Sequence, residues 1–201
     1  MTRIVFLLSA FLSIATIAAA QAPPPAVGTA QGLQVLYATL KRDVTASAQK
    51  LPESDYAFRP TSEIRTFGQL IGHFADAQFL MCAPAKGGIN PRQGQPSFET
   101  LTSKAEIQKA LADSFAFCDE AFSSLTEENA GQLLPGAPMT PQQMSRGLVL
   151  FGVLWHGREV YGISTVYLRL KGLVPPSTET AAAGRGRGAT NAGSGGDGRG
   201  R

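Results

Sequence analysis

The sequence has few of the residues that carry chemistry in most enzymes: its 201 residues include two histidines, two cysteines and one tryptophan. It contains no phosphate-binding glycine motif between a strand and a helix, and no serine or threonine nucleophile motif. Charged residues make up only 16%, and the net charge of +3 comes from the two ends. Between residues 21 and 180 there are 13 basic and 14 acidic residues, so no basic face supports a nucleic-acid partner.

Long apolar runs are also scarce, and the one clear example opens the chain. Arg3 precedes an apolar run over residues 4–19, and alanines occupy positions 18–20. This pattern predicts a secretory signal peptide over residues 1–20. The alternative is an uncleaved membrane anchor, but the run is shorter than the roughly 20 residues that span a bilayer. We therefore expect an exported protein, periplasmic or secreted, with no transmembrane segment in the mature chain.

Hydrophobic residues recur at helical spacing in four segments, and no segment has a convincing strand pattern. The predicted helices cover residues 31–49, 66–84, 103–124 and 141–171. Three of them begin with capping-box patterns, at Thr66 with Gln69, Ser103 with Glu106, and Thr140 with Gln143. A proline- and glycine-rich loop of about 17 residues separates the second and third helices, which is long for a compact domain.

These features predict an all-α fold, a four-helix bundle with a long crossover between helices 2 and 3. We expect a proline-rich linker over residues 21–30, the bundle domain over 31–177, and a disordered Gly/Arg-rich tail over 178–201.

The crossover bears on the two cysteines, Cys82 and Cys118. A loop of this length can run back along a helix, so that helices 2 and 3 are parallel. Cys82 then lies 16 positions beyond Thr66, and Cys118 lies 15 beyond Ser103, at nearly equal height. Because an oxidising compartment permits pairing, we predict a Cys82–Cys118 disulfide; the alternative is two buried free thiols.

The two histidines lie in apolar stretches near the middle of their predicted helices. His73 has Asp76 three residues later, and His156 has Glu159 at the same spacing, so each pair shares one side of a helix. Facing each other across the bundle, these side chains could hold a divalent metal ion. The alternative is two hydrogen-bonded core histidines with solvated carboxylates. Cys82 lies about 180° around the helix from His73, which disfavours a catalytic Cys–His pair.

Several segments of the chain together resemble the DinB-like family, over about residues 30–177. They are HFADAQF (73–79), FAFCD (115–119), WHGREVYG (155–162) and YLRLKGLVPP (167–176). The resemblance implies a four-helix bundle with a long crossover. In many members it also implies a divalent metal held by three histidines, one in helix 2 and an H-x-x-x-H pair in helix 4. His73 and His156 match the first two positions, whereas the third falls on Val160, which cannot bind a metal.

The site implied by the resemblance is therefore His73 and His156 with a carboxylate as third ligand, either Asp76, which is preferred, or Glu159. The metal would be Zn, Ni, Mn or Fe, with thiol-transferase or hydrolase chemistry. The alternative is a non-catalytic bundle without metal that serves as a binding or structural module in the cell envelope. A homodimer and an unidentified small-molecule partner are compatible with both. The sequence assigns no catalytic residue and no other cofactor.

Overall fold

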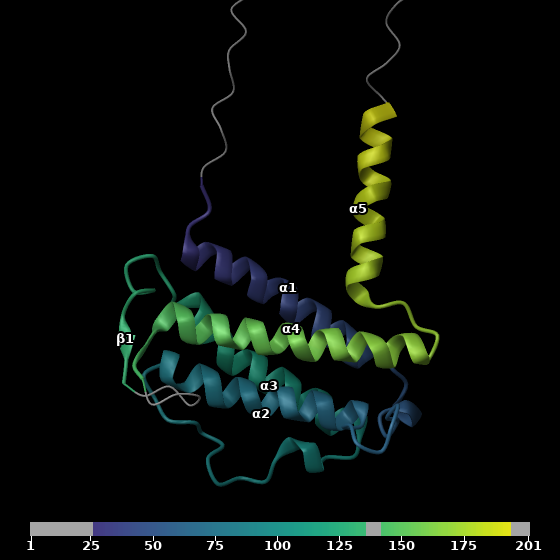
Figure 1. Cartoon of the computed structure of the whole chain (residues 1–201), viewed down its shortest axis with the longest axis horizontal. Coiled ribbons are helices and arrows are strands. Elements are labelled where there is room, and N and C mark those ends of the chain that lie inside the picture. The colour runs from purple at the N-terminus through teal and green to yellow at the C-terminus, as the bar shows by residue number, and fades with distance from the viewer. Residues whose placement is uncertain (1–25, 136–141, 194–201) are drawn as a thin grey trace, which may run out of the picture.

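The computed structural model describes residues 26–135 and 142–193, with side chains described as far as Arg185. Four long helices pack side by side as a bundle, and a fifth stands away from it (Figure 1). The helices are α1 (Thr29–Lys50), α2 (Phe67–Ala85), α3 (Lys104–Ser123), α4 (Arg146–Leu170) and α5 (Pro176–Gly193); the short elements are the 3₁₀ turns η1 (Glu53–Asp55) and η2 (Phe98–Thr100) and the strands β1 (Leu133–Leu134) and β2 (Met144–Ser145). The predicted all-α class and four-helix bundle are confirmed.

Helices α2 and α3 run parallel, as the crossover predicts. Near their starts, Gly68 lies against Ile107; further along, the Gln78 amide donates to the Ser114 hydroxyl at 2.9 Å. One turn beyond that pair, Cys82 and Cys118 form the predicted disulfide, with Cα atoms 5.4 Å apart. Both cysteines are fully buried, so the disulfide is part of the core.

Helices α1 and α4 run parallel to each other and antiparallel to the first pair. Arg158 of α4 donates to the buried carboxylate of Asp43 in α1, and Leu40 packs against Gly157. On the other side of α1, the Tyr37 ring stacks on Phe122 of α3. These contacts close a core in which each of the four helices contributes fully buried side chains.

The crossover between α2 and α3 lies along the outer side of α2. The Asp76 carboxylate accepts hydrogen bonds from Arg92 Nε at 3.1 Å, Ser97 Oγ at 2.7 Å and the Phe98 backbone N–H at 2.8 Å. Gly72 permits the close approach, because a Cβ there would lie 2.5 Å from the Phe98 carbonyl oxygen. The crossover is thus fastened to the helix at the level of His73.

The start of α4 differs from the sequence prediction. The helix begins at Arg146 with Ser145 as N-cap, whose hydroxyl accepts from the Leu148 N–H, rather than at Thr140–Pro141. Residues 144 and 145 instead pair antiparallel with residues 134 and 133. A backbone hydrogen bond from the Gly147 N–H to the Ala130 carbonyl stabilises this start of the helix. Tertiary pairing therefore outweighs the local proline signal, although Thr140 and Pro141 themselves lie outside the described residues.

Residues 176–193, which include the first part of the predicted tail, form α5. Pro176 occupies the first helical position, where its missing N–H costs nothing, and alanines follow at 181–183. The helix is tied to the bundle by Ser177, which contacts the Tyr161 hydroxyl, and by an ion pair of Glu179 with Lys50. The rest of the predicted tail, 194–201, lies outside the described residues.

At the other end, α1 begins at Thr29, so it takes in the last two residues of the predicted linker over 21–30. The predicted signal peptide over 1–20 lies outside the described residues. Within the described part of the chain, no helix combines the length and hydrophobicity needed to cross a membrane.

Candidate functional site

The two histidines meet between α2 and α4. The rings of His73 and His156 lie edge to face, with centroids 5.2 Å apart and an interplanar angle of 82°. Their side chains are 31% and 19% exposed, so both rings are partly accessible to solvent. The helices bring them together because α2 and α4 run antiparallel and Phe74 and Gly157 pack directly beside the pair.

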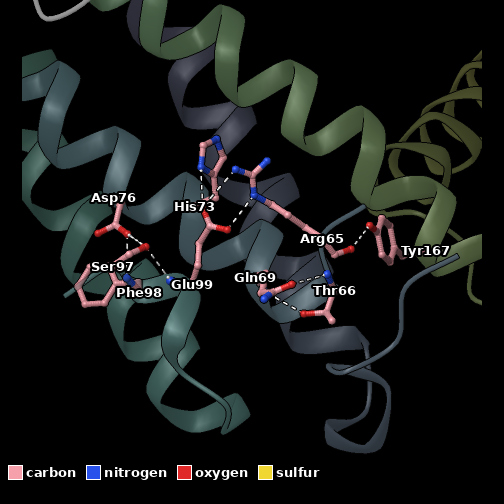
Figure 2. A network of polar contacts seen from close by, with 9 residues as sticks. All are labelled: Arg65, Thr66, Gln69, His73, Asp76, Ser97, Phe98, Glu99 and Tyr167. Carbon is pink, nitrogen blue, oxygen red and sulfur yellow. Dashed lines mark hydrogen bonds and ion pairs between the residues drawn. The ribbon is translucent and has the colours of Figure 1, made fainter. Parts of the chain in front are cut away.

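His73 is held by a carboxylate that the sequence analysis missed. Glu99, in η2 of the crossover, lies with Oε1 3.1 Å from His73 Nδ1. The same carboxylate accepts from Arg65 at 2.9 Å (Nε) and 3.2 Å (Nη2). Figure 2 shows Glu99 between His73 and Arg65. No spacing rule could link Glu99 to a histidine 26 residues earlier; only the crossover fastened by Asp76 brings them together.

His156 has a looser carboxylate partner on its own helix. Glu159 Oε2 lies 3.5 Å from His156 Nδ1, as the i, i+3 spacing predicts. Burial lowers the pKa of His156 below its usual value, the charges of His73 and Arg65 act in the same direction, and Glu159 opposes them. The lowered pKa favours the neutral imidazole, the form that binds metals.

In both rings it is Nδ1 that faces a carboxylate. Because an ionised carboxylate only accepts hydrogen bonds, a neutral ring that donates to it does so from a protonated Nδ1 and keeps the lone pair on Nε2. The contacts of both rings with carboxylates are made by Nδ1, and among the described residues none forms a hydrogen bond with Nε2 of either ring. Carboxylates that orient histidines in this way are a recurrent feature around metal sites.

The predicted third ligand, Asp76, is directed elsewhere. Its carboxylate is used by Arg92, Ser97 and Phe98, and Figure 2 shows it turned toward Ser97 and Phe98. Glu159 lies beside His156 Nδ1 as described, and Val160 is buried, 2% exposed. Across residues 26–135 and 142–193, no three His, Cys, Asp or Glu side chains form a group that could hold a metal ion.

The histidine pair itself nevertheless fits a divalent ion. Two imidazoles bound to one tetrahedral ion at about 2.1 Å have ring centres about 5 Å apart, close to the separation seen here. The available donors are the two Nε2 atoms, with Glu99 and Glu159 beside the two Nδ1 atoms. The arrangement therefore suits an ion with two protein ligands and open positions for external ones.

A protein-family model described as the DinB superfamily matches residues 36–159, more than half of the chain. The match includes both histidines, both cysteines and the crossover with Glu99. No curated protein matches the chain.

Solved structures share the fold. A DinB-like protein from Bacillus cereus ATCC 10987 superposes with a TM-score of 0.61 at 16% identity, covering 73% of this chain and 95% of that one. A DinB-like protein from Bacillus subtilis gives 0.57 at 17% identity, with 71% and 94% covered. A conserved protein from Enterococcus faecalis gives 0.56 at 13% identity, with 72% and 98% covered. At these identities the likeness concerns the fold alone.

Proposed function

Because this chain belongs to the DinB superfamily, we propose that it is an exported member that binds one divalent metal ion between His73 and His156. The observation that carries the proposal is the ring pair, with centroids 5.2 Å apart and each Nδ1 facing a carboxylate. Each Nε2 is then the free donor. Zinc, nickel, manganese and iron are the candidate ions, and imidazole ligands suit zinc, nickel and iron best.

The proposed site is open because Val160 supplies no donor. Water or a substrate would complete the coordination, and the neighbouring Arg65 guanidinium favours an anionic group such as a thiolate or carboxylate. A metal ion held there would supply a Lewis acid for a thiol or a water molecule. These are the requirements of thiol-transferase or hydrolase chemistry. In this proposal Glu99 and Glu159 orient the imidazoles through Nδ1, which leaves Nε2 of each ring for the ion.

Export is part of the same proposal. Its supports are the leader pattern over residues 1–20 and the buried Cys82–Cys118 disulfide, since disulfides persist in oxidising compartments. The test is export of the full chain followed by N-terminal sequencing. A mature protein that begins at Gln21 agrees with the proposal; a protein retained in the cytoplasm contradicts it.

The metal is tested by elemental analysis and calorimetric titration of the exported protein, purified without a histidine tag. We expect about one equivalent of divalent metal, and its loss in His73→Ala and His156→Ala. Asp113→Asn is the matched control, because the exposed Asp113 carboxylate on α3 pairs with Lys109 and belongs to neither the site nor the crossover. Binding that survives both histidine substitutions places the ion elsewhere and contradicts the proposal. No binding after reconstitution also contradicts it and leaves the non-catalytic bundle as the explanation.

A further inference from the structure

A pocket at one end of the bundle lies away from the histidine pair. It is enclosed by the end of α2, the first part of the crossover, β1 and the start of α4, which Figure 1 shows at the same end of the molecule. Its volume is about 830 Å³, which is within the range of small-molecule sites. We call it the end pocket; its lining includes Leu80, Pro84, Ile89, Leu133, Leu134 and Arg146.

Most of the described lining of the end pocket is apolar. The side chains of Ile89, Leu133 and Leu80 are 82%, 60% and 42% exposed, whereas Leu134 beside them is buried. Large apolar side chains that stay open to solvent around a hollow are typical of binding sites. The end pocket therefore offers a surface for the apolar part of a ligand.

Arg146 is the only charged side chain among the described lining residues, so it has no carboxylate partner within the end pocket. Its Nη2 donates to Gln132 Oε1 at 3.3 Å, which is a long hydrogen bond, and its Nε is buried without a hydrogen-bond partner. A guanidinium has five N–H donors, so most of those on Arg146 are unused by the described residues. Because a cation with unpaired donors is costly to enclose, the arrangement points to an anionic ligand.

We propose that the end pocket binds a small amphiphilic carboxylate, whose head accepts hydrogen bonds from Arg146 and whose apolar body lies against Leu80, Ile89 and Leu133. The planar guanidinium matches the geometry of a carboxylate, and one cation balances one negative charge. A phosphate monoester carries nearly two negative charges at neutral pH, for which the described lining has a single cation. The chemistry of the end pocket therefore favours a monocarboxylate over a phosphate.

The end pocket is separate from the proposed metal site. Arg146 precedes His156 on α4 by ten positions, which corresponds to roughly 15 Å along the helix axis. Neither histidine belongs to the lining of the end pocket. Binding there needs no metal ion, so this proposal and the proposed function can fail independently.

The test is calorimetric titration of the mature exported chain with octanoate, in the presence of a metal chelator. Two comparison ligands separate the parts of the proposal: acetate has the carboxylate without the chain, and 1-octanol has the chain without the charge. We expect octanoate to bind at least tenfold more tightly than either of them. No binding of octanoate, or equal affinity for one of the comparison ligands, overturns the proposal.

Substitutions then locate the ligand. Arg146→Gln should weaken octanoate binding at least tenfold and leave the affinity for 1-octanol unchanged, whereas Leu133→Gln should weaken the binding of both. The control is Arg169→Gln, the same change at an exposed arginine near the other end of α4. Circular dichroism establishes that the variants are folded. Octanoate affinity that Arg146→Gln leaves unchanged overturns the proposal, and so does loss of octanoate binding in His73→Ala, which would place the carboxylate at the histidine pair.

Discussion

His73 and His156 lie edge to face, with ring centroids 5.2 Å apart, and each turns Nδ1 toward a carboxylate. The two carboxylates come from different places: Glu99 from the crossover and Glu159 from the same helix as its histidine. The proposed site therefore has two oriented nitrogen donors in place of the three histidines implied by the family resemblance. The third position of the family pattern, Val160, supplies no donor.

Val160→His should strengthen metal binding. Val160 lies one turn beyond His156 on α4, so an imidazole there adds a third nitrogen donor on the same side of the helix. We expect at least a tenfold gain in zinc affinity by calorimetric titration, with some loss of stability because the position is buried.

The matched control is Val149→His, a substitution at another buried valine of α4, which should destabilise the bundle without the gain in affinity. Equal zinc affinity in wild type and Val160→His would show that the side chain at position 160 does not reach the histidine pair.

Gly72→Ala should loosen the crossover. The new Cβ would lie 2.5 Å from the Phe98 carbonyl oxygen, and the backbone there cannot yield without moving Glu99 away from His73. We expect a net loss of about 1–2 kcal/mol, since the overpacking cost exceeds the gain in helix propensity. Hydrogen exchange should speed up in η2. Gly88→Ala, whose Cβ meets nothing, is the control; equal exchange rates in both variants would refute the steric explanation.

Removing the Cys82–Cys118 disulfide should destabilise the bundle substantially. The sequence separation of 36 residues corresponds to about 3–4 kcal/mol in the chain-entropy description. Urea unfolding of the Cys82→Ala, Cys118→Ala double variant measures the loss, and added reductant should then have no further effect. A loss below about 1 kcal/mol would mean that the reduced chain is already constrained.

Alkaline pH should destabilise the fold through buried tyrosines. Burial raises the pKa of Tyr56 to about 12, and burial also raises the pKa of Tyr37. The folded chain therefore keeps protons that the unfolded chain releases near pH 10, so the unfolding free energy is unaffected below about pH 10 and falls above it. Denaturant unfolding across this range measures the slope, which Tyr56→Phe should reduce. An identical slope in the variant would contradict the assignment.

Local sequence signals identified most of the fold. The Thr66–Gln69 capping box starts α2 as expected, and the Ser103 hydroxyl caps α3. The length of the crossover was enough to predict parallel α2 and α3, and from that the disulfide. The capping hydrogen bonds lie within one helical turn, and the parallel arrangement of α2 and α3 follows from the length of the crossover.

The errors arose where distant segments decide the outcome. The start of α4 depends on pairing of residues 144–145 with 133–134, which overrides the Thr140–Pro141 signal. Glu99 reaches His73 only because Asp76, Gly72 and Phe98 hold the crossover against α2. Helical spacing places Asp76 beside His73, and in the structure its carboxylate accepts hydrogen bonds from three groups of the crossover. Helical spacing predicts that two residues share one face of a helix, but it does not predict which other side chains or backbone groups they contact.

The most direct test of the metal proposal is a long-range ¹H–¹⁵N spectrum of the exported chain during titration with zinc. The chain has only two histidines, so their four ring nitrogens can be assigned with His73→Ala and His156→Ala. We predict that zinc shifts Nε2 of both rings while both Nδ1 atoms stay protonated toward Glu99 and Glu159. If no imidazole nitrogen shifts, or if only one ring responds, the two histidines do not share a metal ion.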